Sequence, residues 1–119
     1  MQPTKDDCYT TSVKYCGCIE FHLDEERRHG FHTSQLIDYT LEPNPDAGEG
    51  KNAPPQKLAL AFSTADVVIL GWRLGRLAEL LRENNLATVH VLPKRYADLA
   101  PARPFVASIM ITPISKSPL

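Results

Sequence analysis

This chain of 119 residues has no long hydrophobic run and no excess of charge of either sign. No stretch approaches the roughly 20 apolar residues that a membrane-spanning helix needs. The N-terminus, MQPTKDDCYTT, has no apolar segment of the kind found in signal peptides. The net charge of −1 argues against binding nucleic acid through charge alone. We therefore expect a cytoplasmic protein that binds neither membranes nor nucleic acid.

Cysteine is scarce as well, with residues only at Cys8, Cys16 and Cys18. An odd number without an export signal argues against a disulfide framework, so we interpret all three as reduced thiols. The spacing Cys-x-Cys differs from the Cys-x-x-Cys of structural zinc sites, and neither Gly-Lys-Ser/Thr nor Gly-x-Gly-x-x-Gly occurs. No phosphate-binding or dinucleotide-binding motif is therefore present, and Ser63, Ser108 and His90 form no recognisable triad order, although triads are spatial.

The most informative stretch is 57–85, KLALAFSTADVVILGWRLGRLAELLRENN. Its first part alternates apolar and small or polar residues, which predicts a strand with one apolar face. The run 67–70 is apolar throughout, which is typical of a strand covered on both faces. If Thr64 and Ala65 form the loop between them, Phe62 pairs with Val67, and the two apolar faces coincide.

An amphipathic helix is predicted over residues 72–84. Its apolar side chains recur at helical spacing and predict the face that meets the sheet: Leu74, Leu77, Ala78 and Leu81. On the outer face, Arg76 and Glu79 are three residues apart and are expected to pair. The helix is expected to end at Asn84, because asparagine tolerates the left-handed conformation that often stops a helix.

Further strands are predicted around residues 15–23, 29–32, 36–41, 87–92 and 105–114. Residues 43–56 are rich in proline and glycine and predict a long flexible loop, while 1–12 and 115–119 are expected to be frayed tails. The predicted fold is a single α+β domain over residues 1–119. It has a mostly antiparallel sheet of about six or seven strands with one principal helix across it. The alternative is a sheet that curls into a partial barrel.

The first candidate site is a metal site made of Cys18, Glu20, His22 and His32. If Phe21 pairs with Phe31 in the first hairpin, Glu20 lies opposite His32, and all four potential ligands share the face away from the core. Thiolate and imidazole suit zinc or a similar divalent ion. The alternative is a polar surface that carries a few histidines and no cofactor.

The second candidate is an anion site formed by Trp72, Arg73 and Arg76 at the start of the predicted helix. Free backbone N–H groups at a helix N-terminus attract anions. The alternative is structural: Gly71 ends the strand, Gly75 permits close helix packing, and the arginines are solvated or paired.

The leading hypothesis for function is a non-catalytic interaction or regulatory module that pairs with itself as a homodimer or with another protein. It depends on apolar residues that one helix cannot cover, above all in 67–70 and at Val106, Met110 and Ile114. The second hypothesis is a small metal- or anion-binding protein, a sensor or hydrolase-like protein that uses one of the two candidate sites. An enzyme with a pocket under the helix ranks third.

Overall fold

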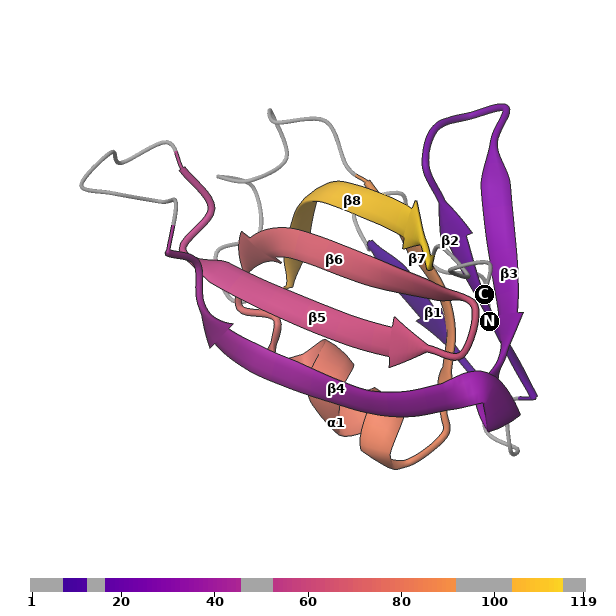
Figure 1. Ribbon diagram of the computed structural model, residues 1–119. Helices are drawn as coiled ribbons and strands as arrows, with labels where there is room; N and C mark the ends of the chain where they lie inside the picture. Colours follow the sequence, from indigo (N-terminus) through magenta and orange to yellow (C-terminus); the bar gives the residue numbers. More distant parts are fainter. Residues whose placement is uncertain (1–7, 13–16, 46–52, 92–103, 115–119) are drawn as a thin grey trace, which may run out of the picture.

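A computed structural model describes residues 8–12, 17–45, 53–91 and 104–114 (Figure 1). In these ranges the chain forms eight strands, one α-helix and one turn of 3₁₀ helix. They are β1 (Tyr9–Thr11), β2 (Cys18–His22), β3 (Arg28–His32), η1 (Thr33–Gln35), β4 (Leu36–Pro43), β5 (Gln56–Phe62), β6 (Ala65–Trp72), α1 (Gly75–Arg82), β7 (Leu86–His90) and β8 (Phe105–Pro113).

The described strands form two open four-stranded sheets rather than one. Sheet A has the order β1-β7-β2-β3, and sheet B has the order β4-β5-β6-β8. All neighbours are antiparallel except β2 and β7, which run parallel. The prediction of a mostly antiparallel α+β fold is confirmed, whereas the prediction of a single sheet of six or seven strands is wrong.

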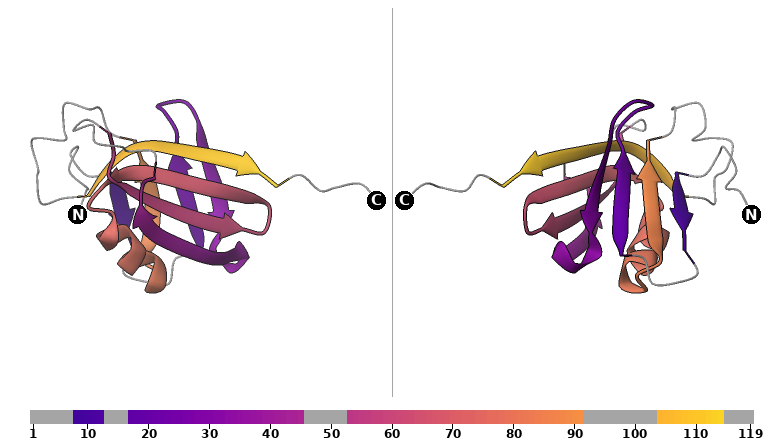
Figure 2. Two further views of the ribbon diagram at one scale, coloured as in Figure 1. Left: turned by 60° about the vertical axis from the view of Figure 1, so that its left-hand side comes forward. Right: turned by 90° about the vertical axis from the view of Figure 1, so that its right-hand side faces the viewer.

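The core lies between the inner faces of the two sheets, whose strands cross at a steep angle (Figure 2). Its centre is an aromatic cluster in which Phe21 meets Phe31 edge-to-face at 5.9 Å and Phe31 stacks on Phe62 at 4.3 Å. Aliphatic side chains from both sheets surround it, among them Ile19, Leu58, Leu60, Val67, Ile69 and Val89. A second sheet, and not the helix, therefore covers the apolar face of sheet B.

In the hairpin of β5 and β6, the side chains point to the predicted faces, but the strand register differs from the predicted one by two residues. Leu60 pairs with Val67 and Ala61 with Asp66, so Ser63 and Thr64 are left for the turn. The predicted pair of Phe62 and Val67 is wrong. The reason is that Ala65 is 4% exposed and belongs to the core, whereas Ser63 and Thr64 are polar and exposed.

The same shift occurs in the first hairpin. Phe21 lies opposite His29 rather than Phe31, Glu20 lies opposite Gly30, and Cys18 lies opposite His32. The longer turn follows from Asp24, whose carboxylate accepts hydrogen bonds from the backbone N–H groups of Glu26 and Arg27 at 2.8 Å. The predicted register is wrong, although Ile19, Phe21 and Phe31 do face the core.

The helix is shorter than predicted and occupies a different place. Strand β6 continues to Trp72, and Arg73 then takes a left-handed conformation (φ 55°), so α1 begins only at Gly75. It ends at Arg82, two residues before the predicted end, and Asn84 just beyond it takes the expected left-handed conformation (φ 58°). At about 1.5 Å per residue, the eight residues of α1 are too short to cross a four-stranded sheet. The helix contacts β4 and β7 instead and lies beside β4 (Figure 1). Three of its leucines are buried in the core, namely Leu77, Leu80 and Leu81.

Two predictions about the chain ends and the long loop also change. Tyr9–Thr11 is not frayed but forms β1 on β7, and Cys8 is fully buried, with its thiol 3.4 Å from the carbonyl of Pro104. The loop is tied at its base, because the side-chain and backbone amides of Asn44 both donate to the other end, at Pro54 and Pro55. Residues 46–52 and the predicted tail at 115–119 lie outside the described ranges. Among the described residues, no helix is long and apolar enough to span a membrane.

Candidate functional site

The outer face of sheet B is the surface that its strand registers define most clearly. Three rows of side chains cross the four strands in the order β4, β5, β6, β8. They are Asp38–Ala61–Asp66–Thr112, Thr40–Ala59–Val68–Met110 and Glu42–Lys57–Leu70–Ser108. The middle row carries no charge, and its Met110 is 64% exposed. The alternation that buries one face of the sheet thus leaves a largely uncharged strip on the other.

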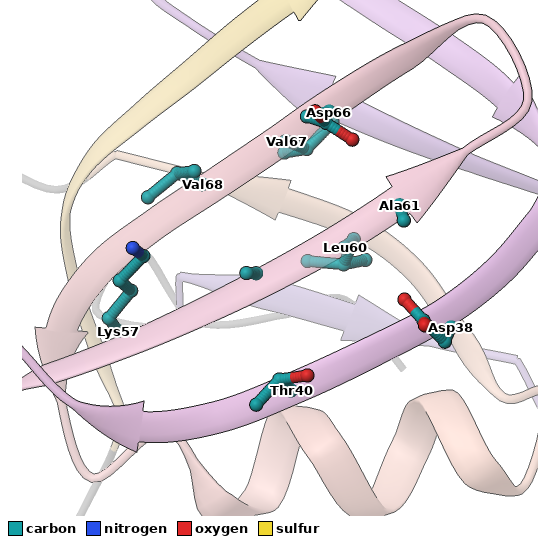
Figure 3. A pocket seen from close by; sticks show the side chains of 9 residues that line it. Asp38, Thr40, Lys57, Leu60, Ala61, Asp66, Val67 and Val68 are labelled. Atoms are coloured by element: carbon teal, nitrogen blue, oxygen red, sulfur yellow. The ribbon is translucent and has the colours of Figure 1, made fainter.

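A shallow hollow of about 270 Å³ runs along β5 on this face (Figure 3). It exists because β5 has the small side chains of Ala59 and Ala61 between larger side chains on β4 and β6. Thr40 and Val68 form its flanks.

Opposite charges mark the two ends of the hollow. Asp38 and Asp66 are both paired with Ala61 and lie on either side of it, at the end near the β5–β6 turn (Figure 3). Neither carboxylate forms an ion pair with any residue that the structure describes. At the other end, Lys57 lies 3.8 Å from Glu42, with 30% of its side chain exposed. This arrangement suits a ligand or partner with one cationic group and an apolar stretch.

The outer face of sheet A is polar and paired within itself. The Glu20 carboxylate accepts a hydrogen bond from His22 Nε2 at 2.7 Å and lies 3.4 Å from Arg28. The His22 hydrogen bond, together with Arg28, holds the pKa of Glu20 below its ordinary value of 4.5, against the opposing effect of desolvation. The rings of His22 and His90 lie 5.6 Å apart across the parallel β2–β7 pair. Chemically, the group is a carboxylate that orients an imidazole.

The four predicted metal ligands lie on this same face but do not meet at one point. The corrected register places Cys18 and His32 opposite one another, while Glu20 and His22 lie further along β2 toward the hairpin turn. Within the residues that the structure describes, no group of three or more His, Cys, Asp or Glu side chains is arranged to hold a metal ion. A zinc site here stays a prediction for which the geometry offers no support.

Two residues of the predicted anion site, Trp72 and Arg76, are engaged in structural contacts. Trp72 belongs to β6 and packs edge-to-face on Phe105 at 5.4 Å. Hydrogen bonds to Tyr9 and then to Glu79 raise the pKa of Arg76, and the expected Arg76–Glu79 pair is present at 3.3 Å. The backbone N–H of Leu74, before the helix, donates to the side-chain oxygen of Gln56 at 2.6 Å. Anion binding at Trp72, Arg73 and Arg76 stays a prediction.

The two glycines of this segment differ from each other. A Cβ on Gly71 would clash with the carbonyl oxygen of Phe105, so the absence of a side chain lets β8 approach β6 at a bulge. A Cβ on Gly75 would meet nothing within 4 Å. The structural interpretation is therefore wrong on both glycines: β6 continues past Gly71 to Trp72, and Gly75 makes no close helix packing.

The sequence analysis missed the residues of the hollow. The signal was present in the alternation of Ala59 and Ala61 with large apolar residues, which put two small side chains in succession on the outer face. Asp38 and Asp66 are 28 positions apart, and only the pairing of β4 with β5 and of β5 with β6 brings both next to Ala61.

No family model matches the chain, and neither a curated protein nor a solved structure gives a match. Function has to be inferred from the geometry of the outer faces.

Proposed function

We propose that this protein is a non-catalytic interaction module that works as a homodimer and uses the outer face of sheet B as its interface. The observation that carries the proposal is Met110, an apolar side chain 64% exposed in the uncharged middle row, beside the half-buried Val68. Apolar side chains that adjoin one another on an open face are typical of association surfaces. A two-fold homodimer is the commonest way to cover such a face.

The edge strand supports the same surface. Strand β8 has a single strand neighbour, β6, and none of its nine residues, FVASIMITP, is charged. Edge strands usually carry charges that discourage association, as β4 does with Asp38 and Glu42. The absence of such charges on β8 supports the outer face of sheet B as an association surface.

The expected dimer is weak. Four strands about 4.8 Å apart and eight residues at roughly 3.3 Å each outline a face smaller than the about 800 Å² per partner of a standard interface. We therefore expect self-association to depend on concentration and to be measurable at tens of micromolar.

The experiment is light scattering on wild type and on Met110→Asp across that concentration range. We expect wild type to associate and Met110→Asp to be a folded monomer, because the new carboxylate would have to be buried in the uncharged row. The control is Ile37→Asp, since Ile37 is 69% exposed at the bulge of β4 and outside the three rows. A wild type that is monomeric throughout would contradict the homodimer.

A further inference from the structure

The face of sheet B is complementary to itself when its strand direction is reversed. Along β5, Ala61 lies at one end, Ala59 in the middle and Lys57 at the other end, all on the same side. A two-fold axis that lies in the plane of contact and crosses the strands at Ala59 keeps each strand opposite its own copy and exchanges the two ends. Ala61 of one copy then lies opposite Lys57 of the other.

We propose that two copies of this chain pack sheet B on sheet B about this axis, so that Lys57 of each copy fills the hollow of the other between Asp38 and Asp66. This inference rests on the proposed homodimer and adds its geometry and its specificity. The occupant of the hollow is a second copy of the same chain.

Charge is the first argument. The Asp38–Ala61–Asp66 row offers two carboxylates without a described ion pair on either side of a methyl group, where only a long side chain can reach between them. Lys57 is the only basic residue in the three rows. Its present contact with Glu42, at 3.8 Å and partly exposed, is of the weak surface kind. In the dimer, the ammonium group of each Lys57 would gain two further carboxylates, Asp38 and Asp66 of the other copy. The two-fold axis repeats this contact at both ends.

Shape is the second argument. Sheets that pack face to face lie about 10 Å apart, so the space above Ala61 is filled only if the opposite sheet supplies a long side chain. A lysine above Ala61 occupies that space with its methylene chain and brings its ammonium group to the level of the aspartates. The middle row meets itself, so that Val68 and Met110 each lie opposite their own copies and exclude water from that part of the contact, beside the two facing Ala59 methyl groups.

The test exchanges the charges. In Lys57→Glu, each end of the dimer would hold four carboxylates, since Glu42 lies beside residue 57. In Asp38→Lys/Asp66→Lys, each end would hold three ammonium groups beside the Glu42 carboxylate. We expect each variant alone to lose self-association at least tenfold in dissociation constant, as measured by sedimentation. Mixed one to one, they should form a heterodimer, because one end is then native and the other has the same pairs reversed.

The mixing step separates the possible results. Restoration by mixing supports the inference, and it also shows that both variants are folded. The matched control is Arg28→Glu, which makes the same charge change as Lys57→Glu on the outer face of sheet A, and we expect it to associate as wild type does.

Two other results overturn the inference in distinguishable ways. If Lys57→Glu still associates while Met110→Asp does not, the homodimer stands but its geometry is different, with strand β8 as its centre. If wild type does not associate with itself, the homodimer fails, and the inference about Lys57 fails with it.

Discussion

The two outer faces of this sandwich differ in whether their charged side chains pair within the same chain. On sheet A, the charged side chains find their partners within the face, as Glu20 does with His22 and Arg28. On sheet B, Asp38 and Asp66 have no described ion pair, and the row beside them is uncharged. The first face is complete in one chain, whereas the second has features that a partner would complete.

The difference arises from the side chains and not from the sheets. Both sheets have four strands, and both bury their inner faces in the same core. Long polar side chains on β2 and β3 can reach one another across the strands, whereas the methyl groups of Ala59 and Ala61 cannot reach either aspartate. Ala61, placed between Asp38 and Asp66, thus leaves both carboxylates without a cation on the neighbouring strand.

The largest effect is expected from a substitution in the core that the two sheets share. Phe62→Ala would remove a fully buried ring that stacks on Phe31 and meets Phe21. We expect a loss of about 3–5 kcal/mol in the free energy of unfolding, measured by denaturant titration, because a cavity would form where the two sheets meet. Both outer faces should be lost in one transition.

Its control is the neighbouring Ser63→Ala, an exposed turn residue, which should change the free energy of unfolding by less than about 0.5 kcal/mol. Two separate unfolding transitions in Phe62→Ala would contradict the idea that one core supports both faces.

The sequence predicted which way side chains point but not which residues are opposite one another. In both hairpins the alternation assigned Ile19, Phe21, Leu58 and Leu60 to the core correctly, and in both the register is two residues away. A shift of two leaves every side chain on its own face, so the apolar pattern cannot detect it. Turn geometry decides it, through the Asp24 hydrogen bonds in one hairpin and the burial of Ala65 in the other.

That ambiguity is what misplaced the candidate site. The predicted register, with Phe21 opposite Phe31, would place Glu20 opposite His32 and bring the four predicted ligands together. The observed register pairs Cys18 with His32 instead. The hollow was beyond prediction for a related reason, since it requires β4, β5 and β6 to be neighbours in known register. Local features fared better: the left-handed conformation of Asn84 and the Arg76–Glu79 pair depend only on nearby residues.

A smaller change should make the face of sheet B resemble that of sheet A. Ala61→Lys would place an ammonium group of the same chain between Asp38 and Asp66, directly across from both. Opposite charges at such cross-strand positions contribute about 0.2–1 kcal/mol each, so the melting temperature should rise slightly. Self-association should fall, because the hollow is filled and Lys57 of a second copy would meet a like charge.

The control for that change is Ala59→Ser, which keeps the middle of the hollow small. We expect it to associate as wild type does. A more stable Ala61→Lys variant that still associates fully would contradict the hollow as the contact point, although not the pairing of its carboxylates.

The smallest expected effect concerns the face that is already complete. Because the hydrogen bond from His22 and the charge of Arg28 lower the pKa of Glu20 below 4.5 in the folded chain, the folded state binds this proton less tightly than the unfolded state does. The stability that Glu20 contributes is therefore present above the unfolded pKa and lost as the pH falls through the folded one.

Glu20→Gln should be less stable than wild type near pH 6, and the two should converge toward pH 3. Denaturant titrations across this range measure the difference, with Glu25→Gln at the exposed hairpin tip as the control for removing a carboxylate. A difference between wild type and Glu20→Gln that stays constant with pH would show that the side chain acts through packing, and that the pairing within sheet A contributes nothing by charge.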